Sequence, residues 1–564
     1  MNYLERYDFW CNADLPLDVK AELASIKNDT EELKGRFGSD LQFGTAGMRG
    51  IMGAGSNRLN RYTVRRAAQG MAAWLSTTDL PKKAAIGYDS RHNSQLFAEV
   101  CAVAFAEVGI KTHLFDRLAP TPMLSYAVRE LGCGCGIVIS ASHNAGEYNG
   151  VKCYGPDGCQ MTDAPAAIVT EKISTIPYFV AEKKPFSSYL AEGLIQYISQ
   201  DLWESYYQTV LNESVDPDMI RKAGLNIVYT PLCGTGNEPV REVLGRLGVN
   251  IAVVECQEKP DGDFKTCEYP NPETDAALNE SYKIARNAPC DVILGTDPDC
   301  DRVAIAVPEG DGFRKLSGNE LGCLLIDYIL KARTALGDIP EDAIVVRSIV
   351  SSPLADRIAE HYGVTMKAVL TGFKYIGGEI LALEERDQQN KFIFGFEESC
   401  GYLKGTYARD KDAVVASMLV CELAASLKLQ GKSILDALDE IYTTYGIYLA
   451  YVQSIELTGA DAMEKAAKMM ADLRSAVPAS IGGANVTAVR DYRSSIAKDL
   501  TTGDESKILL PKSNVLEFLL GDKGSVIARP SGTEPKVKFY YTAVASTKNE
   551  AEKLLTAMKA QMSK

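Results

Sequence analysis

Apolar and polar positions follow one another along the chain in an order that recurs three times. In each repeat an apolar run of strand length precedes a polar turn, an amphipathic helical stretch and a second apolar run. Glycine follows each helical stretch, where a helix C-cap is expected. The first apolar runs begin at Ala84, Asn226 and Ala343, and the glycines are Gly109, Gly248 and Gly363. The pattern predicts three β-turn-α-β units.

Each repeat leads to one more short strand and then to a loop of unusual composition. The strands are predicted at 137–139, 292–294 and 392–394. In open α/β sheets, ligands bind beyond the carboxyl ends of the strands. Alternation of strands and helices also favours mostly parallel or mixed sheets. The three loops are therefore the first candidates for a functional site.

The alternation ends after about residue 455. Residues 489–493 and 513–519 are predicted as strands of a hairpin sheet, and a helix is predicted from Asn549 to Lys564. A chain of 564 residues is too long for one hydrophobic core. The predicted fold class is α/β, with three related mixed-sheet α/β modules followed by a C-terminal α+β domain. The predicted domain ranges are 1–205, 206–325, 326–455 and 456–564.

Composition and charge exclude several classes of protein. Apolar residues make up 46% and charged residues 24% of the chain, as in an ordinary globular protein. The net charge of −14 and the lack of a long basic run argue against binding to nucleic acid or to anionic membranes. The start of the chain has no apolar signal region, and no apolar stretch of 18 residues occurs. Fourteen scattered cysteines without a C-x-x-C pair indicate reduced thiols in a cytoplasmic enzyme.

Three alternate carboxylates form the most specific local pattern. Asp297, Asp299 and Asp301 lie in an extended loop, where alternate side chains point to one side. Their oxygens are ligands suited to Mg²⁺, and without a cation they would repel one another. A calcium EF-hand is excluded, because its sixth position is Arg302 and its twelfth is Pro308.

A hydroxyl group stands at the end of the first predicted loop strand. Ser142 follows the apolar run 137–139 and is flanked by His143 and Asn144. A hydroxyl in this place suits a nucleophile or a phosphate carrier. The alternative is an ordinary polar turn.

Two further segments have groups that suit a phosphate. Arg529, Ser531, Gly532 and Thr533 supply a guanidinium, hydroxyls and glycine-opened backbone within five residues, although a tight turn between strands would need similar residues. Arg49 lies among five glycines in residues 44–55, without the Gly-Lys-Ser/Thr ending of a nucleotide P-loop.

The third loop has groups that suit a vicinal diol. Glu397 and Ser399 offer an acceptor and a donor side by side, although buried polar residues satisfied by backbone are an alternative. Nearby cations occur in the runs 371–374 and 409–412, for which a solvated surface charge run is the default interpretation.

Taken together, these loops resemble those of the α-D-phosphohexomutase superfamily. Ser-Ala-Ser142-His143-Asn is similar to its phosphoserine loop, and Asp297-Pro-Asp299-Cys-Asp301-Arg302 to its magnesium loop. Glu397-Glu-Ser399 is similar to the sugar-binding loop, and Arg529-Pro-Ser531-Gly532-Thr533-Glu to the phosphate-binding loop. Arg49 and Lys152 match the basic residues near the reacting oxygens. The resemblance covers essentially the whole chain.

The resemblance implies four domains around one central cleft and a defined reaction. Phosphorylated Ser142 would give its phosphoryl group to a bound sugar monophosphate, and the resulting bisphosphate would return the other phosphate to Ser142. Mg²⁺ would bind Ser142, Asp297, Asp299 and Asp301, and Lys152, Arg49 or His143 would serve acid–base or charge-stabilising roles. Glucose 1,6-bisphosphate would prime the enzyme. The implied substrate-binding residues are Arg302, Thr371, Gly372, Lys374, Glu397, Ser399, Lys411, Arg529, Ser531, Gly532 and Thr533.

One departure leaves the sugar open. Phosphomannomutase-type sugar loops commonly read Gly-Glu-Met-Ser-Gly-His, whereas residues 395–402 read Gly-Phe-Glu-Glu-Ser-Cys-Gly-Tyr, without the histidine. This form is closer to the glucose- or pentose-phosphate branch, and interconversion of glucose 1-phosphate and glucose 6-phosphate is the favoured expectation. Mannose and pentose phosphates remain alternatives, and a monomer or a homodimer is expected.

Two interpretations belong to other classes. A magnesium-dependent phosphatase or serine hydrolase would use Ser142 and His143. No G-x-S-x-G elbow surrounds Ser142, and residues adjacent in sequence rarely face one another. A sugar-phosphate-binding protein without turnover would not need the intact reactive groups of all four loops.

Overall fold

The computed structural model describes residues 1–44, 47–458, 461–531 and 536–562. The chain divides into two compact units. Unit 1 comprises residues 1–318, 376–395 and 399–431, and unit 2 comprises residues 319–375, 396–398 and 432–564.

Three short helices precede the first module of unit 1. They are α1 (Tyr3–Cys11), α2 (Leu17–Ser25) and α3 (Thr30–Phe37). Asn2 and Asp29 cap the first and third helices by accepting backbone N–H bonds, which explains where they begin. Trp10 and Phe37 fill their small core. The helices support the turn after strand β1, because Ala54 N donates to Glu22 Oε1 at 3.1 Å.

The first module is a mixed six-stranded sheet with the order β1-β5-β4-β2-β3-β6. Strands β2, β3 and β4 are parallel, and β5 runs antiparallel between β4 and β1. Its core includes Trp74, Phe105 and Ile137. The strands are β1 (Gly47–Ile51), β2 (Lys83–Tyr88), β3 (Lys111–Leu114), β4 (Cys135–Ile139), β5 (Tyr148–Tyr154) and β6 (Ile195–Tyr197). The helices are α4 (Arg61–Ser76), α5 (Ser94–Ala106), α6 (Thr121–Glu130), α7 (Asp163–Thr175), α8 (Phe186–Ala191) and α9 (Gln200–Asn212).

The second module repeats this plan in a five-stranded sheet with the order β11-β10-β9-β7-β8. Strands β7, β8 and β9 are parallel, and β10 is antiparallel to β9. The strands are β7 (Asn226–Thr230), β8 (Asn250–Val253), β9 (Val292–Thr296), β10 (Val303–Glu309) and β11 (Gly312–Lys315). The helices are α10 (Pro217–Ala223), α11 (Asn237–Arg246), α12 (Glu255–Glu258) and α13 (Asp275–Ala285). Helix α14 (Gly318–Leu336) follows and, apart from Gly318, lies in unit 2.

The third module begins with parallel strands β12 and β13, joined through α15. Within unit 1, the apolar helix α17 packs against α10 and α11 and is almost wholly buried, which explains its nearly uninterrupted hydrophobic sequence. The strands are β12 (Ile344–Ser348), β13 (Thr365–Val369), β14 (Phe392–Glu397) and β15 (Gly401–Lys404). The helices are α15 (Leu354–His361), α16 (Phe373–Glu384), η1 (Gln389–Lys391), α17 (Ala413–Leu429) and α18 (Ile434–Tyr445).

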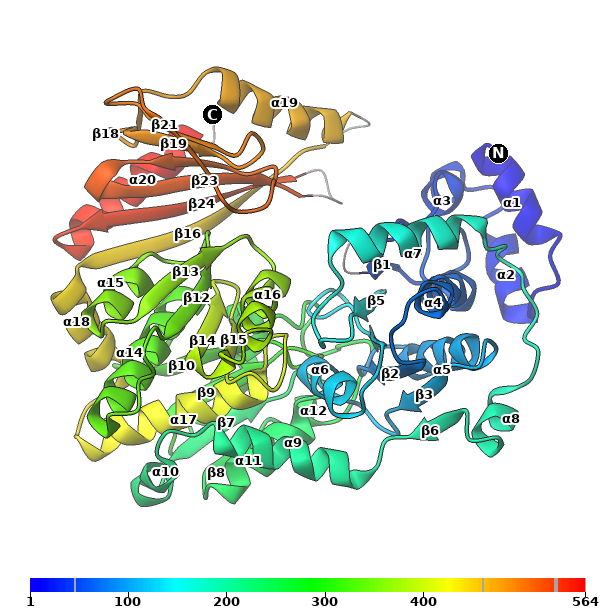
Figure 1. Ribbon diagram of the computed structural model, residues 1–564, viewed down its shortest axis with the longest axis horizontal. Helices are drawn as coiled ribbons and strands as arrows, with labels where there is room; N and C mark the ends of the chain where they lie inside the picture. The colour runs from blue at the N-terminus through cyan, green and yellow to red at the C-terminus, as the bar shows by residue number, and fades with distance from the viewer. Residues whose placement is uncertain (45–46, 459–460, 532–535, 563–564) are drawn as a thin grey trace. The chain divides into compact units, whose positions relative to one another are not determined.

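The C-terminal domain is built on an antiparallel seven-stranded sheet with the order β16-β24-β23-β22-β19-β20-β21 (Figure 1). Because β16 pairs with β24 along its whole length, the predicted boundary between residues 455 and 456 falls inside a strand of this sheet. The strands are β16 (Ile447–Glu456), β17 (Ser480–Ile481), β18 (Ala484–Asn485), β19 (Ala488–Asp491), β20 (Ile496–Asp499), β21 (Glu505–Lys507), β22 (Leu516–Leu519), β23 (Gly524–Pro530) and β24 (Lys536–Ala545). The helices are α19 (Ala462–Ser475), η2 (Gly521–Lys523) and α20 (Lys548–Met562).

The predicted α/β class, with three related modules and a C-terminal α+β domain, is confirmed. The three C-cap glycines all have left-handed backbone, with φ of 78° at Gly109, 81° at Gly248 and 67° at Gly363. The modules share a second backbone feature that the sequence does not reveal. Just beyond β4, β9 and β14, one non-glycine residue is left-handed: Ser142, Cys300 and Cys400, with φ of 53°, 54° and 61°. Non-glycine residues with this backbone conformation are uncommon. Their recurrence after three equivalent strands indicates that the three loops share one backbone turn.

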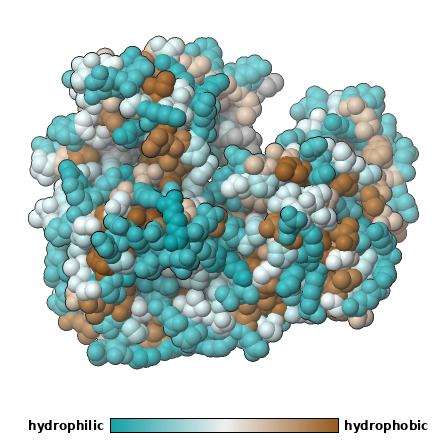
Figure 2. Space-filling model, viewed as in Figure 1, coloured by the Kyte–Doolittle hydropathy of each residue, from teal (hydrophilic) through white to brown (hydrophobic). Residues whose placement is uncertain are grey.

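Surface and hydropathy give two further observations. On the face shown in Figure 2, hydrophobic residues lie in small groups among hydrophilic ones. Among the described residues, no single helix is both long and apolar enough to cross a membrane, although the consecutive helices α17 and α18 meet those limits as a pair.

Candidate active site

The Ser142 loop, residues 140–149, follows the buried strand β4 and includes the first two residues of β5. Ser142 is nearly fully buried and left-handed, with its N–H donating to Ser140 Oγ at 2.8 Å. This turn directs the hydroxyl to the second module, where Ser142 Oγ donates to Asp297 Oδ2 at 2.7 Å. Ser142 Oγ also lies 3.2 Å from His143 Nδ1. Ser142 and His143 therefore face one another although they are adjacent in sequence, which was expected to be rare.

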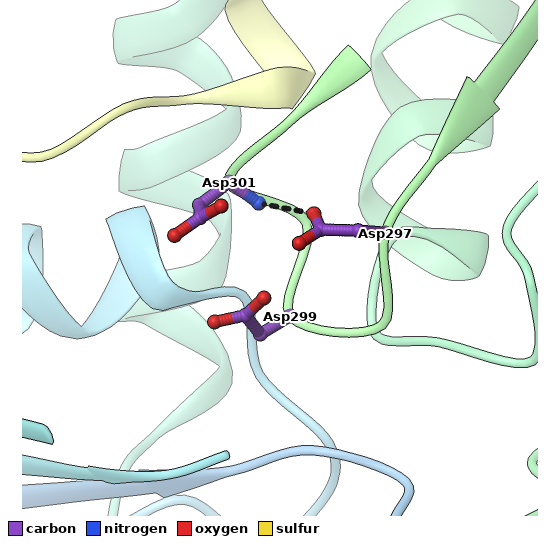
Figure 3. A group of neighbouring side chains, drawn as sticks. All are labelled: Asp297, Asp299 and Asp301. Carbon is purple, nitrogen blue, oxygen red and sulfur yellow. Dashed lines mark hydrogen bonds between the residues drawn. The ribbon is translucent and has the colours of Figure 1, made fainter. Parts of the chain in front are cut away.

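The aspartate loop, residues 297–302, follows the buried strand β9. Asp297 Oδ1 accepts hydrogen bonds from the N–H groups of Asp301 and Arg302, each at 3.0 Å, and these bonds fold the loop on itself. Asp297, Asp299 and Asp301 are buried, and one carboxylate oxygen from each lies within 4.8 Å of the others. Figure 3 shows the three carboxyl groups turned toward one another. The alternate spacing thus does bring the carboxylates together.

The charge balance of this loop fits a divalent cation. Lys152 Nζ lies 2.5 Å from Asp299 Oδ2 and 3.2 Å from Asp301 Oδ2, and Lys411 Nζ lies 3.1 Å from the latter oxygen. Two lysines therefore face three carboxylates. Among the described residues, Oδ1 of Asp299 and of Asp301 accept no hydrogen bond, although both are buried. Buried oxygens without donors are costly, and a hard cation would satisfy them.

The pKa values reflect this crowding. Burial and the neighbouring charge of Asp299 raise the pKa of Asp297 well above its usual value. Burial alone would lower the pKa of Lys152, but the carboxylates of Asp299 and Asp301 raise it above its usual value. Lys152 is therefore a cation at neutral pH, and a metal ion would allow Asp297 to ionise as well.

The pKa of His143 is shifted in the opposite direction. Burial, followed by the positive charges of Arg302 and Arg49, lowers its pKa well below the usual value. The imidazole is therefore neutral at neutral pH and can accept a proton, but it does not supply a positive charge.

Both arginines predicted for this region lie at the two loops. Arg49 Nη1 donates to Asn144 Oδ1 at 3.0 Å, which places β1 against the Ser142 loop. Arg302 Nη1 lies 2.6 Å from Glu273 Oε1, and Arg302 Nε lies 3.8 Å from Asp301 Oδ1. Arg302 is thereby held beside the carboxylates with its charge partly compensated by Glu273.

The run 409–412 was wrongly expected to be a surface charge run. All four residues are buried, because each charge has a partner. Asp410 Oδ2 accepts from Tyr154 Oη at 2.8 Å, and Asp412 Oδ2 accepts from Tyr206 Oη at 2.9 Å. Lys411 is thus delivered to the aspartate loop by a buried polar network within unit 1.

The sugar-loop and phosphate-loop residues of unit 2 form a second group. Glu397 Oε1 accepts from Gly372 N at 2.7 Å, and Glu398 Oε2 accepts from Ser348 Oγ at 3.1 Å. Burial and then the charge of Glu398 raise the pKa of Tyr540, on β24, while Arg529 on β23 opposes them. Arg529, Tyr540 and the two glutamates are therefore neighbours.

For the remaining predicted residues, the structure gives fewer contacts. Lys374 Nζ lies 5.2 Å from the centre of the Tyr375 ring. Thr371 is half-buried, with its Oγ1 accepting and donating no hydrogen bond among the described residues. Ser399 is half-buried in unit 1 and Ser531 half-buried in unit 2. Gly532 and Thr533 lie outside the described residues.

The sequence did not identify two residues that support the loops. Thr121, at the start of α6, donates from Oγ1 to Asp299 Oδ2 at 2.8 Å, and its N–H donates to Asp299 O at 2.9 Å. Arg91, in the turn after β2, binds the Ser142 loop through several carbonyls. The polar turn after β2 was the only local signal for Arg91, and nothing local pointed to Thr121.

Comparison with family models accounts for nearly the whole chain. Residues 40–178, 204–310 and 317–445 match the phosphoglucomutase/phosphomannomutase alpha/beta/alpha domains I, II and III. Residues 473–560 match the C-terminal domain of the same family. The chain belongs to the phosphoglucomutase/phosphomannomutase family. As a member, it is an enzyme of the phosphotransferase/isomerase type, and the resemblance to the α-D-phosphohexomutase superfamily is confirmed.

Curated relatives and solved structures agree with this family. The chain is 36% identical over 513 residues to the phosphoglucomutase of Staphylococcus epidermidis, covering 91% of this chain and 92% of that protein. It is 37% identical over 529 residues to the phosphoglucomutase of Staphylococcus aureus, covering 93% and 94%.

Two solved structures share the fold at low identity. A phosphoglucomutase/phosphomannomutase family protein from Burkholderia thailandensis has a TM-score of 0.67 at 15% identity, covering 93% of this chain and 97% of that one. Parafusin, a phosphoglucomutase of Paramecium, has a TM-score of 0.66 at 16% identity, covering 93% and 94%.

Proposed function

We propose that this protein is a phosphoglucomutase that interconverts α-D-glucose 1-phosphate and glucose 6-phosphate, with Ser142 as the phosphoryl carrier. The observation that supports it most directly is the contact between Ser142 Oγ and Asp297 Oδ2, at 2.7 Å, beside three buried carboxylates and two lysines. The identity to curated phosphoglucomutases favours glucose as the sugar.

The reaction is two phosphoryl transfers in opposite directions. In the first, the free hydroxyl of bound glucose monophosphate forms a bond to phosphorus as the Ser142 Oγ–P bond breaks, and the hydroxyl proton ends on Ser142 Oγ. In the second, Ser142 Oγ forms a bond to the other phosphorus of glucose 1,6-bisphosphate as the sugar O–P bond breaks, and the Ser142 proton ends on that sugar oxygen. Atoms and charge balance over the cycle, so no other reactant is consumed.

Ser142 has two proton acceptors within reach for the second transfer. Asp297 Oδ2 is 2.7 Å and the neutral His143 Nδ1 is 3.2 Å from Ser142 Oγ. Lys152 is protonated and donates toward the carboxylates, so its role is to neutralise negative charge. Positioned groups of this kind are the main source of catalysis in phosphoryl transfer, where the transition state spreads negative charge over the phosphoryl oxygens.

Asp297, Asp299 and Asp301 would hold Mg²⁺, since one oxygen of each lies within 4.8 Å of the others and Oδ1 of Asp299 and of Asp301 is buried without a donor from the described part of the chain. Bound there, Mg²⁺ would neutralise charge on the transferring phosphoryl group. Arg529, Ser531, Gly532 and Thr533 would hold the phosphate that does not react, while Glu397 and Ser399 would bind sugar hydroxyls together with Thr371, Gly372 and Lys374. Arg302 and Lys411 would face the reacting phosphate.

The setting of the enzyme follows the same proposal. Its partner is a small sugar phosphate, glucose 1,6-bisphosphate serves as activator and intermediate, and the chain acts as a monomer or homodimer in the cytoplasm. Fourteen free cysteines are compatible with a reducing compartment.

A magnesium-dependent sugar phosphatase is the second candidate, because Ser142 Oγ lies within reach of His143 Nδ1 as in a hydrolase. The two candidates differ in product. A mutase forms glucose 6-phosphate from glucose 1-phosphate without releasing phosphate, whereas a phosphatase releases it.

The test follows glucose 6-phosphate and free phosphate from glucose 1-phosphate, with Mg²⁺ and glucose 1,6-bisphosphate, beside ribose and mannose 1-phosphates. Ser142→Ala should lose essentially all turnover and take up no phosphate by intact mass. Ser174→Ala is the control, because it removes an exposed hydroxyl from helix α7 of the same module but leaves Ser142 and its contacts. It should keep phosphate uptake at position 142. Full activity in Ser142→Ala, or release of free phosphate by the wild type, would exclude the mutase.

A further inference from the structure

We propose that Arg91 is a positioning residue for phosphoryl transfer: it holds the Ser142 loop so that the Ser142 oxygen faces the aspartate loop. This inference rests on the proposed phosphoglucomutase function. Arg91 lies in the turn after β2, and β2 is the parallel neighbour of β4, which carries the Ser142 loop. The arginine therefore reaches the loop from the adjacent strand end.

Four backbone carbonyls of the loop accept hydrogen bonds from Arg91. Nη1 donates to Ala145 O at 2.7 Å and to Tyr148 O at 2.9 Å. Nη2 donates to Ser142 O at 2.6 Å and to Asn144 O at 2.5 Å. The bonds span seven residues of the loop and include the carbonyl of the phosphoryl carrier itself.

The guanidinium is held in place on its other sides. Its side chain is fully buried, and Nε lies 3.3 Å from Asp89 Oδ2. Asp89 Oδ1 accepts from Arg91 N at 3.0 Å and from Ser94 Oγ at 2.7 Å, which fixes the turn that carries the arginine. The Phe264 ring, from the second module, lies 5.0 Å from the guanidinium carbon. Arg91 is thus a rigid link between two strand ends.

The backbone of Ser142 explains why such a link is needed. A serine at φ 53° occupies a sparsely populated conformation, so the loop would relax if it were not fixed from outside. Ser140 Oγ fixes the N–H of Ser142, and Arg91 fixes its carbonyl, so both peptide groups of the carrier are bound. Fixing both sides determines the direction of the hydroxyl toward Asp297.

Lysine cannot replace this arrangement. Arginine presents its donors in a rigid planar fork, whereas lysine has one nitrogen that cannot reach four carbonyls at once. With lysine, which has three N–H donors, at least one buried carbonyl would lose its donor and the loop would shift. A displacement of about 1 Å at the reacting atom costs about 100-fold in rate.

The experiment compares Arg91→Lys and Arg91→Ala with Arg66→Lys, a matched control. Arg66 also binds backbone carbonyls in the first module, from Nε to Ile176 O at 2.9 Å and from Nη2 to Ile173 O at 3.1 Å, but far along the chain from Ser142. For each variant we would measure kcat and KM for glucose 1-phosphate, the single-turnover rate of Ser142 phosphorylation by glucose 1,6-bisphosphate, and Tm. The number of active sites comes from the final phosphate stoichiometry.

Arg91→Lys should lower kcat per active site by about 100-fold with KM within about threefold, and slow Ser142 phosphorylation by the same factor. Arg66→Lys should lower Tm alone. Added guanidinium ion should raise kcat of Arg91→Ala about tenfold, because it can bind the four carbonyls in the space that the arginine side chain leaves.

A purely structural Arg91 gives a different result: the active-site count and Tm fall, while the rate per active site stays at the wild-type value. That outcome overturns the proposal. The proposal is also overturned if Arg91→Lys and Arg66→Lys have the same kcat and the same rate of Ser142 phosphorylation. If the wild type itself neither isomerises glucose 1-phosphate nor takes up phosphate at Ser142, the proposed function fails and the role of Arg91 fails with it. The wild-type arm therefore separates the two failures.

Discussion

The Ser142 loop and the aspartate loop stand at equivalent places in two copies of one module, yet they are stabilised in opposite ways. Both follow a fully buried strand, and both contain a left-handed residue, Ser142 or Cys300. The carbonyls of the Ser142 loop are bound from outside by Arg91. The aspartate loop is closed from within, because Asp297 accepts two of its own N–H groups.

This difference matches what each loop would have to do. A loop that is bound through four of its carbonyls by one buried arginine presents one oxygen in a fixed direction, as a phosphoryl carrier requires. The aspartate loop uses one oxygen of Asp297 to fold, and it leaves Oδ1 of Asp299 and of Asp301 buried without donors among the residues that the structure describes, as a cation site requires. Lys152 joins the two, since β5 leaves the first loop and carries this lysine to Asp299 and Asp301.

The largest effect is expected from removing one charge of the aspartate loop. Asp299→Asn should lower kcat by about 1000-fold while KM for glucose 1-phosphate changes by less than about fivefold, because the carboxylate would act on the transferring group rather than on the bound sugar. The concentration of Mg²⁺ needed for half-maximal activity should rise. Steady-state kinetics over a Mg²⁺ series checks both.

Asp311→Asn is the control for this variant, since Asp311 is exposed at the turn after β10 in the same module. It should behave as the wild type. A loss in Asp299→Asn that appears in KM with kcat preserved would mean that the aspartate loop binds substrate and does not stabilise the transition state.

Lys152 provides a test of how the two loops share charge. Lys152→Met removes the cation nearest to Asp299. In the absence of Mg²⁺, the free energy of unfolding should therefore fall by about 3 kcal/mol. Saturating Mg²⁺ should recover most of that loss, because the metal ion would compensate the same carboxylates. Thermal unfolding with and without Mg²⁺ measures the difference.

Lys404→Met is matched to it. Lys404 is equally buried and pairs with Glu213 Oε2 at 2.8 Å, away from both loops. The decrease in Tm of Lys404→Met relative to the wild type should be the same with and without Mg²⁺. Equal responses of the two variants to Mg²⁺ would show that Lys152 and the metal ion do not serve the same carboxylates.

Much of this comparison could be predicted from the sequence, because it depends on short-range patterns. Periodicity and the C-cap glycines located the modules, and the alternation of Asp297, Asp299 and Asp301 located the converging carboxylates. Arg91 and Thr121 could not be assigned a role, because their partners are 51 and 178 residues away. Strand order in the first sheet brings Arg91 to the Ser142 loop, and contact between the first and second modules brings Thr121 to Asp299.

The run 409–412 misled for a related physical reason. Charged residues are usually exposed, unless each one has a partner. The partners of this run lie elsewhere in unit 1, such as Tyr154 for Asp410 and Asp301 for Lys411. Local sequence contains no trace of them, so a buried network and a surface run have the same pattern.

The smallest effect is expected outside both loops, at the ion pairs beneath that run. Glu384 lies 2.8 Å from Arg129 Nη2 and 2.6 Å from the buried Arg409 Nη2. Hydrogen bonds from Arg129 outweigh burial and, with the charge of Arg409, hold the pKa of Glu384 at about 2, against an ordinary value of 4.5. Because the pKa is depressed on folding, these contacts stabilise the fold fully above about pH 4.5 and lose their effect as the pH falls toward 2.

Glu384→Gln should therefore lower Tm by about 2 °C at pH 7, a modest amount because the carboxylate is partly exposed. The gap from the wild type should narrow as the pH falls from about 5 toward 3. Scanning fluorimetry across this range measures the gap, and kcat at pH 7 should stay within about twofold, because Lys411 keeps its own contacts with Asp301 and Asp410. A gap that widened at low pH would contradict the sign of the shift. A large loss of kcat would instead extend the functional network from the two loops to the ion pairs that lie behind Lys411.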